Sequence, residues 1–333
     1  MKVKDFNLKQ TLECGQCFNF EKITDNGSDD IKDCFYEYIV LAKGRMLYVR
    51  QAADELFFLR PIKDKSDEKC SCELPDPADG ELESCPSDEI RNIWIPYFDL
   101  ERDYGLIKEK IIQADERLKD IIGQYYGVRI LNQDFAECLM SFIISQNSNI
   151  PRIRKTVGSI GRKYGRQAGS YKGKDYYVFP EEDQLDKISE EDYRELKTGF
   201  RAAYLRSAAD WLAKKRGAEE RQLQKRDADE RLAKKRGTEE RLKEMSFTEA
   251  KAELMQIKGV GDKVADCVLL FSLAFRNAFP VDVWIKRIME EMYFDGELTD
   301  KKVIEAYADG KFGEYGGYAQ QYLFMYARNR GNA

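Results

Sequence analysis

The hydrophobic pattern near the start of the chain runs in short blocks that are typical of β-strands. Residues 35–41 and 46–50 are rich in aromatic and β-branched side chains, which pack well on a pleated sheet. Residues 42–45, between them, contain a glycine that suits a tight turn. We therefore expect a β-hairpin here, within an N-terminal antiparallel sheet that carries accompanying helices.

From residue 90 onward the pattern becomes helical. Apolar residues occupy almost every face of residues 135–145, which predicts a helix buried on all sides. Residues 153–164 place apolar side chains at spacings of four, three and four, which predicts an amphipathic helix. The expected fold class is α+β, with a sheet domain at 1–100 and a mostly helical domain at 101–333.

Two charged stretches interrupt the predicted sheet domain and helical domain. Residues 63–90 hold three lysines against ten acidic residues, a net charge of −7, and lack apolar periodicity, so we expect an acidic loop. Its three cysteines leave a metal site as a weaker alternative. Residues 213–245 contain a nine-residue unit that recurs at an offset of twenty, with twelve basic and eight acidic residues. We interpret them as a duplicated, solvated helical insertion in preference to a DNA-contacting arm.

Composition excludes several kinds of chemistry. The 333 residues include no histidine, which excludes Ser-His-Asp triads, HExxH zinc sites and histidine bases. Eight cysteines without a secretory leader indicate reduced thiols, and Cys14 and Cys17 lack the second pair that a metal site needs. No cysteine follows Cys267, which excludes a four-cysteine cluster near the C-terminal end. No run approaches the roughly 18 apolar residues of a membrane span.

The net charge of −5 is unevenly distributed. Because residues 63–90 carry −7, the rest of the chain sums to +2. A local basic face is therefore compatible with the acidic average.

The most informative segment is a helix, a Gly-Val-Gly turn and a second helix at residues 254–267. It places Lys263 in the first turn of the second helix, where backbone N–H groups are unpaired and the helix dipole is positive. Glycine-rich turns of this kind present N–H groups to phosphates. Asp282 lies nineteen residues after Lys263 and directly follows a Pro-Val dipeptide.

Lys263 and Asp282 admit two interpretations. In the plain one, Lys263 is an exposed phosphate-binding lysine and Asp282 caps the helix that begins near Trp284. In the other, the positive helix end favours the neutral amine that a nucleophile needs, and Asp282 stabilises a cationic sugar. We favour the second interpretation because of the motifs around it.

Several local motifs resemble one family. They lie at residues 12–18, 127–150, 199–204, 254–267 and 317–324. On these residues the chain resembles the helix-hairpin-helix-Gly/Pro-Asp superfamily of DNA glycosylases, and within it the 8-oxoguanine DNA glycosylase/AP lyases of eukaryotic type. The resemblance covers most of the chain outside the two charged stretches.

The resemblance implies a base-excision repair enzyme. It would flip 8-oxoguanine out of damaged double-stranded DNA, cleave the N-glycosidic bond through a Schiff base on Lys263 with help from Asp282, and nick the strand by β-elimination. It implies no metal, no cofactor and no membrane partner. We expect a cytoplasmic monomer, associated with the nucleoid if the source is prokaryotic.

The resemblance also assigns residues to the damaged base. The Gly15 carbonyl would accept the N7–H that 8-oxoguanine carries and guanine lacks. Phe324 and Cys267 would stack on the two faces of the base, and Gln320 would bind its Watson–Crick edge.

Further residues would contact the rest of the DNA. Asn147 would fill the space that the flipped nucleotide leaves, and Arg152 and Arg201 would bind the orphaned cytosine. The turn that would hold a phosphate is Gly259, Val260 and Gly261.

Three positions depart from the family pattern. Phe200 replaces a tyrosine wedge, Ser148 replaces an asparagine, and Trp284 replaces a histidine. We place Phe200 and Trp284 among the expected DNA-binding residues, although the change from histidine leaves the kind of contact at Trp284 open. Two other functions also fit part of the pattern. An endonuclease III-like pyrimidine-lesion glycosylase/lyase would share the lysine and aspartate but commonly carries cluster cysteines. A non-catalytic helix-hairpin-helix DNA-binding protein would use the turn alone.

The departures predict a weaker preference for cytosine opposite the lesion than the eukaryotic enzymes have. Excision rates measured on duplexes with 8-oxoguanine opposite each of the four bases are expected to be similar. A cytosine preference as steep as that of the eukaryotic enzymes would contradict this.

Overall fold

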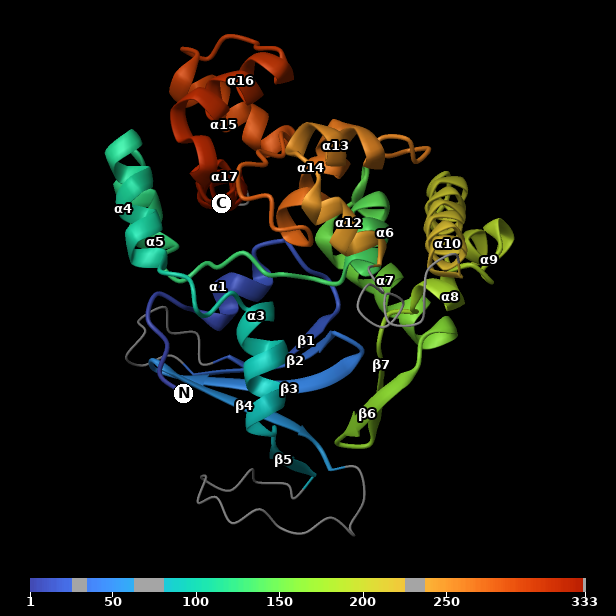
Figure 1. The fold of residues 1–333 in the computed structure, drawn as a ribbon. Coiled ribbons are helices and arrows are strands. Elements are labelled where there is room, and N and C mark those ends of the chain that lie inside the picture. The colour runs from blue at the N-terminus through green and yellow to red at the C-terminus, as the bar shows by residue number, and fades with distance from the viewer. Residues whose placement is uncertain (26–34, 63–80, 225–236, 332–333) are drawn as a thin grey trace.

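The predicted β-hairpin lies at the centre of a five-stranded antiparallel sheet (Figure 1). Lys43 and Gly44 form its turn with φ angles of 53° and 66°, the positive values that a two-residue hairpin turn needs. The computed structural model describes residues 1–25, 35–62, 81–224 and 237–331. The strands, in sheet order, are β1 (Phe20–Asp25), β2 (Phe35–Ala42), β3 (Arg45–Ala52), β4 (Glu55–Pro61) and β5 (Leu82–Ser84).

Both faces of the sheet pack against other elements. Side chains alternate along each strand, so the strands contribute to a hydrophobic core on each face. Tyr36 and Tyr38 of β2 pack into a core with Trp94 and Phe98. The elements on that side are α1 (Leu8–Glu13), α2 (Ser87–Glu89), η1 (Ile90–Trp94) and α3 (Ile95–Tyr97). On the opposite side Tyr48 contacts Tyr171, with ring centroids 5.1 Å apart. Tyr171 belongs to a second hairpin, β6 (Gln167–Tyr171) and β7 (Lys174–Tyr177).

Outside the two sheets, the described residues are mostly helical, which confirms the predicted α+β class. Helix α6 (Phe135–Ser145) is buried along nearly its whole length, as predicted, and it packs against α7 (Ile150–Tyr164), α10 (Arg201–Gln224) and α14 (Asp262–Phe271). The other helices are α4 (Tyr104–Ala114), α5 (Leu118–Gln124), α8 (Glu182–Leu185), α9 (Glu190–Glu195), α12 (Thr238–Glu244), α13 (Phe247–Leu254), α15 (Val283–Tyr293), α16 (Lys301–Phe312), η2 (Gly313–Tyr315) and α17 (Gly316–Gly331).

Gln16 joins the sheet domain to the helical domain. Its buried amide nitrogen donates to the carbonyls of Thr11 and Arg129 at 2.9 and 2.7 Å. Its amide oxygen accepts the Leu131 N–H at 2.8 Å, and its backbone carbonyl accepts the Gln133 side chain at 2.8 Å. The loop after α1 is therefore held against the segment that leads into α6.

The prediction of an acidic loop at residues 63–90 is wrong for residues 82–84 and 87–89. Residues 63–80 lie outside the described part, but Leu82–Ser84 form β5 and Ser87–Glu89 form α2. Strand β5 is stabilised because Leu82 is buried and Glu83 pairs with Arg60 at 2.7 Å. Only one side chain of this three-residue strand is buried, which gives too little periodicity to predict the strand from the sequence.

The insertion predicted for residues 213–245 is only partly solvated. Helix α12 buries Thr238 and Leu242, and Leu242 belongs to the main core. Lys215, in the first copy of the repeat, forms an ion pair with Glu253 of α13. The second copy is therefore partly anchored, although residues 225–236 lie outside the described part.

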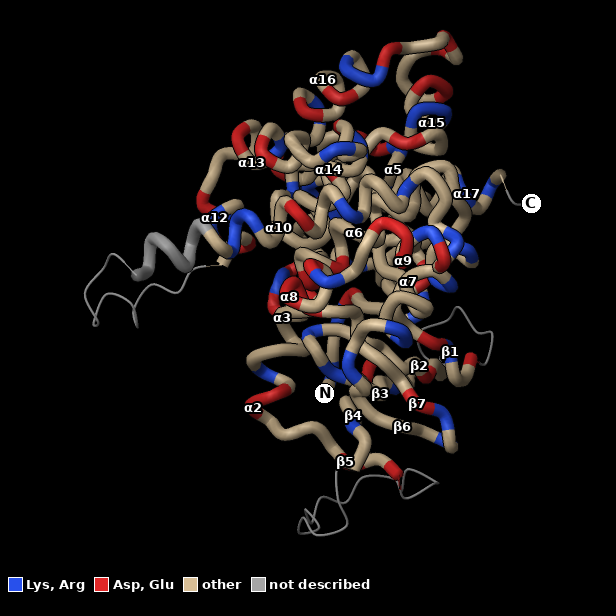
Figure 2. Tube along the Cα trace, turned by 90° about the vertical axis from the view of Figure 1, so that its right-hand side faces the viewer, with Lys and Arg blue, Asp and Glu red and all other residues tan. Residues whose placement is uncertain are grey.

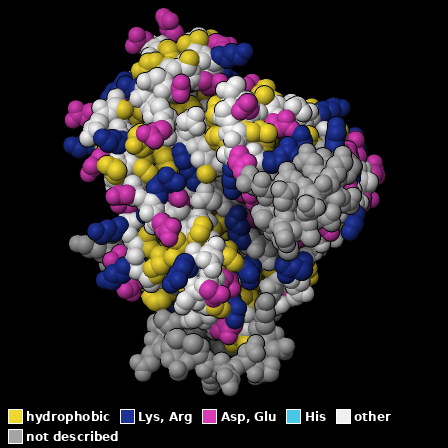
Figure 3. All heavy atoms as spheres, viewed as in Figure 1, with side chains coloured by type: hydrophobic (Ala, Val, Ile, Leu, Met, Phe, Trp, Pro, Cys, Tyr) yellow, Lys and Arg dark blue, Asp and Glu magenta, His cyan; other side chains and the backbone are white. Residues whose placement is uncertain are grey.

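Charge is spread over the outside of the molecule. Figure 2 shows Lys and Arg interspersed with Asp and Glu along most elements, and the face drawn in Figure 3 carries basic, acidic and apolar side chains side by side. Among the described helices, none is long and apolar enough to cross a membrane.

Replacing Gln16 with leucine is expected to lower the free energy of unfolding by on the order of 3 kcal/mol, because it leaves buried carbonyls and an N–H unpaired. Urea denaturation of the purified protein measures the change. Gln113→Leu, at an exposed position of α4, is the matched control. Equal stability of the two variants would contradict the role of Gln16.

Candidate active site

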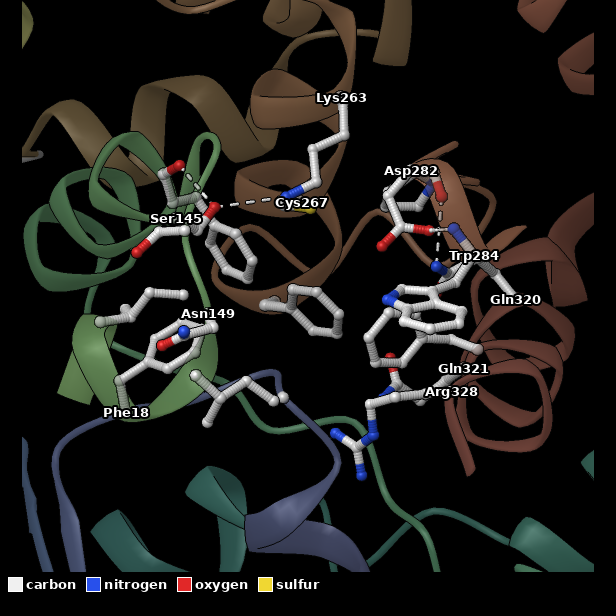
Figure 4. A pocket seen from close by; sticks show the side chains of 18 of the residues that line it. Phe18, Ser145, Asn149, Lys263, Cys267, Asp282, Trp284, Gln320, Gln321 and Arg328 are labelled. Carbon is white, nitrogen blue, oxygen red and sulfur yellow. Dashed lines mark hydrogen bonds between the residues drawn. The ribbon is translucent and has the colours of Figure 1, made fainter. Parts of the chain in front are cut away.

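The largest concentration of predicted site residues lies around a cavity of about 460 Å³ between the two domains (Figure 4). Its walls come from the loop after α1, the α6–α7 connection, α14, the start of α15, and α17. Seven predicted site residues line it: Gly15, Lys263, Cys267, Asp282, Trp284, Gln320 and Phe324. These positions are up to 309 residues apart in the sequence, from Gly15 to Phe324.

The predicted hairpin joins α13 to α14. Gly259 has a φ of +89°, and a Cβ there would lie 2.2 Å from the Tyr204 ring, so only glycine fits. The Gln146 side chain donates to the Gly259 carbonyl at 3.0 Å. Gly261 is the N-cap of α14. Val260 is buried and its N–H donates to Ile257, so its contact with DNA stays a prediction.

Lys263 is the second residue of α14, as predicted. Its Nζ donates to Ser145 Oγ at 3.3 Å and lies 5.1 Å from the centroid of the Phe142 ring. Ser145 in turn donates to the Phe142 carbonyl at 2.8 Å. The amine is thus held at the cavity wall by the end of α6, with a hydroxyl as its hydrogen-bond partner.

Cys267 lies one helical turn after Lys263 and presents its side chain to the same cavity. Burial raises the pKa of its thiol to about 12. It therefore stays protonated at neutral pH and behaves as a small apolar surface. That state suits contact with an aromatic ligand and does not suit a nucleophile.

Asp282 serves as a helix cap and lines the cavity at the same time. Its Oδ1 accepts hydrogen bonds from the N–H groups of Trp284 and Ile285 at 3.0 and 2.8 Å. The prediction that Asp282 caps this helix is therefore confirmed. Burial raises the pKa of its carboxyl above the ordinary value, although the two N–H donors and Lys263 oppose that rise. The carboxylate is desolvated, which strengthens its interaction with any cation placed in the cavity.

Gly15 and Gln320 provide polar contacts on the remaining walls. Gly15 has a φ of +85°, and a Cβ there would lie 3.3 Å from Phe324, so glycine brings the backbone close to that ring. Gln320 is buried, and its Nε2 donates to the Pro280 carbonyl at 3.2 Å. Its Oε1 has no hydrogen-bond partner among the described residues. An unpaired buried acceptor of this kind suits a ligand with N–H donors.

The residues predicted to meet the opposite strand form a separate group. The side chain of Phe200 is 53% exposed, which suits a stacking wedge. Arg201 lies over that ring at 4.6 Å, but it is buried and donates to the carbonyls of Gln146 and Asn147. Burial and the nearby charge of Arg152 lower the pKa of Arg201. Contact of Arg152 and Arg201 with an orphaned cytosine stays a prediction.

Asn147 has a φ of 48°, in the left-handed region that asparagine tolerates better than most residues. It does not line the cavity. Its position beside Arg201 is compatible with the predicted insertion into a duplex, which stays a prediction.

Trp284 is held firmly at the cavity edge. A Cβ on Gly331 would lie 2.3 Å from its ring, and the Arg287 guanidinium lies 5.6 Å from it. Because residue 331 is a glycine, α17 leaves the space that the indole ring of Trp284 occupies.

Sequence reasoning missed several cavity residues: Phe18, Phe142, Ser145, Ile150, Gln321 and Arg328. Three of them, Phe18, Phe142 and Ile150, are apolar and resemble ordinary core positions. Arg328 could have been found from the sequence, because it follows Gln320 and Phe324 at intervals of four residues on one face of α17. Ser145 could have been found only through its contact with Lys263.

Two family models match the chain. Residues 1–139 match the N-terminal domain of 8-oxoguanine DNA glycosylase. Residues 140–312 match the HhH-GPD superfamily of base excision DNA repair proteins.

Named relatives agree with these matches. N-glycosylase/DNA lyase OGG1 of Arabidopsis thaliana is 34% identical over 220 residues, which is 64% of this chain and 55% of that protein. The chain therefore spans little more than half of the plant relative. A probable N-glycosylase/DNA lyase of Methanothermobacter thermautotrophicus is 30% identical, over 73% of this chain and 75% of its own length.

A solved structure covers nearly the whole chain. The 8-oxoguanine glycosylase/lyase of Clostridium acetobutylicum, in complex with double-stranded DNA containing cytosine opposite 8-oxoguanine, has a TM-score of 0.76 and 33% identity. The match covers 99% of this chain and 94% of the clostridial one.

Asp282→Asn is expected to raise the free energy of unfolding at neutral pH and to change it little near about pH 3. A carboxyl whose pKa is raised in the folded state loses stability as pH rises through that pKa, whereas asparagine does not. Asparagine also keeps the cap. Urea denaturation as a function of pH measures both profiles.

The control is Asp300→Asn, at the exposed N-cap of α16, which separates capping from burial. A stability difference for Asp282→Asn that is absent at neutral pH, or that grows as pH falls, would contradict the effect of burial.

Proposed function

This chain belongs to the HhH-GPD superfamily of base excision DNA repair proteins, and we propose that it is a bifunctional 8-oxoguanine DNA glycosylase and AP lyase. The observation that carries the proposal is the convergence of Lys263 and Asp282 on one cavity whose other walls suit a purine. The N-terminal family match and the clostridial structure support the same substrate.

Lys263 acts as the nucleophile in this proposal. Its neutral amine attacks C1′ of the flipped nucleotide, so that the N–C1′ bond forms while the bond from C1′ to the base breaks. The base leaves with that electron pair and takes up a proton. The desolvated Asp282 carboxylate stabilises the cationic character that develops on the sugar. Ser145 orients the amine through its hydroxyl.

Strand cleavage follows from the same adduct. Opening of the sugar ring gives an iminium ion on Lys263, which acidifies the C2′ proton. Removal of that proton and departure of the 3′-phosphate oxygen complete the β-elimination. Each step uses the chain's own side chains and water, so the proposed mechanism requires no metal or cofactor.

Base recognition uses the remaining walls of the cavity. Phe324 and Cys267 offer apolar surfaces for stacking. The Gly15 carbonyl accepts N7–H in this proposal, and the Oε1 of Gln320 accepts N–H donors of the Watson–Crick edge. Guanine would place a lone pair against the Gly15 carbonyl, which disfavours it.

Duplex DNA is the proposed partner, and the protein acts as a monomer. The Gly259–Gly261 turn and the positive end of α14 hold a phosphate. The exposed Phe200 wedges into the stack, and Asn147 occupies the vacated space. We also propose a cytoplasmic location, with association with the nucleoid if the source is prokaryotic.

Borohydride trapping on duplex DNA with a single 8-oxoguanine tests the proposal. The wild-type protein is expected to form a covalent adduct and to nick the strand. Lys263→Gln is expected to lose the adduct and to lower nicking on the order of 10³-fold or more. Denaturing electrophoresis of labelled DNA measures both.

Lys258→Gln is the matched control, because it removes an exposed positive charge from the same hairpin without removing the proposed nucleophile. It should retain the adduct. Trapping only on oxidised pyrimidines would support an endonuclease III-like activity. DNA binding without any adduct would support a non-catalytic binding protein.

A further inference from the structure

Arg328 extends the cavity face of α17 beyond the residues used so far. Gln320, Phe324 and Arg328 follow one another at intervals of four residues, so they form one stripe along the helix. All three line the cavity. The Arg328 guanidinium lies 5.6 Å from the centroid of the Phe324 ring, and Figure 4 shows it at the edge of the pocket opposite Lys263.

One nitrogen of this guanidinium is unsatisfied. Nη2 contacts the Met325 sulfur at 3.5 Å. Nη1 is buried and has no hydrogen-bond partner among the described residues. Burying an unpaired charged donor is unfavourable, and an arginine can only donate. The missing partner must therefore be an acceptor, such as a carbonyl oxygen or an anion.

The neighbours of Nη1 indicate where that acceptor would lie. A Cβ on Gly15 would be 3.4 Å from Nη1 and 3.3 Å from Phe324. Arg328 therefore faces the Gly15 side of the cavity. A second unsatisfied buried atom on the cavity lining, the Oε1 of Gln320, lies two helical turns away at the opposite end of the stripe. The stripe thus presents an acceptor, an aromatic face and a donor in sequence.

This order complements an oxidised guanine. Its N1–H and N2–H₂ groups are donors for Gln320, its rings can stack on Phe324, and N7–H is flanked by the carbonyl oxygens O6 and O8. We propose that Arg328 is a specificity-determining residue that donates a hydrogen bond from Nη1 to one of these two carbonyl oxygens. The proposal rests on the proposed function, because it requires the damaged base in this cavity.

A DNA phosphate is the competing acceptor. The burial of Nη1 beside Gly15 and Phe324 favours the base, because the phosphates of a bound duplex lie along the protein surface. The two acceptors differ in one measurable respect. A phosphate contact acts on every duplex, whereas a base contact acts only when the base is present.

Equilibrium binding in a Lys263→Gln background tests the assignment without turnover. Four duplexes are compared: one with 8-oxoguanine, one with 8-oxoadenine, one with guanine and one with a tetrahydrofuran abasic site. Arg328→Met is expected to weaken binding of the 8-oxoguanine duplex about tenfold or more and to leave the abasic duplex within about twofold. Unchanged abasic binding also shows that the variant is folded.

The 8-oxoadenine duplex separates the two oxygens, because this base keeps O8 and N7–H but carries an amino group in place of O6. Loss confined to 8-oxoguanine assigns the contact to O6, and equal loss on both bases assigns it to O8. Either result supports the proposal. Arg330→Met, an exposed arginine of the same helix paired with Glu291 at 2.9 Å, is the matched control and should behave like the parent.

Two results would overturn the assignment. Equal weakening on all four duplexes would mean a phosphate contact, and no weakening on any would mean that Arg328 does not touch the DNA. A parent protein that binds 8-oxoguanine no better than guanine would overturn the proposed function together with this inference. The first two results leave the proposed function standing.

Discussion

The hydrogen bonds of Gln16 are the constraint on which the rest of the site depends. They fasten the loop after α1 to the segment that precedes α6. Gly15 is the residue immediately before this anchor, and its backbone lies close to the Phe324 ring. Gln321 also donates to the carbonyl of Cys14 at 3.2 Å, which holds the same loop against α17. The sheet domain thus contributes one wall of a cavity whose chemistry comes from the helical domain.

Buried polar groups in this cavity lower the stability of the free protein but remain available to interact with a ligand. Asp282 carries a raised pKa, and Gln320 and Arg328 each hold an unpaired polar atom in the interior. Such groups are unfavourable in the free protein. They persist because strong packing surrounds them: α6, α14 and α17 belong to one continuous hydrophobic core. A stable scaffold of this kind tolerates a poorly satisfied centre, which a ligand can then complete.

Sequence reasoning succeeded where the signal was local. The hairpin 35–50, the buried helix 135–145 and the placement of Lys263 on α14 each follow from periodicity or from a glycine turn within a few residues.

Sequence reasoning failed where an element is stabilised by contacts with residues distant in the chain. Strand β5 exists because Leu82 and Glu83 meet β4, and Leu242 is buried because α12 packs into the main core. Neither contact leaves a pattern in the chain. The motif resemblance supplied the cavity residues, but the engagement of Arg201 with the backbone was visible only in three dimensions.

That engagement has a consequence for ligand affinity. The guanidinium of Arg201 holds the carbonyls of Gln146 and Asn147, and Asn147 sits in a left-handed conformation that most residues avoid. Nε and Nη2 of this guanidinium are engaged by the loop, and Nη1 donates to the Thr198 carbonyl at 3.1 Å. Reading the opposite strand would require the loop to exchange these bonds first, which reduces apparent affinity by the population of the open form. The loop therefore has to release Arg201 before this side chain can bind a new acceptor, and the equilibrium constant of that release limits how much Arg201 can contribute to the affinity for any ligand.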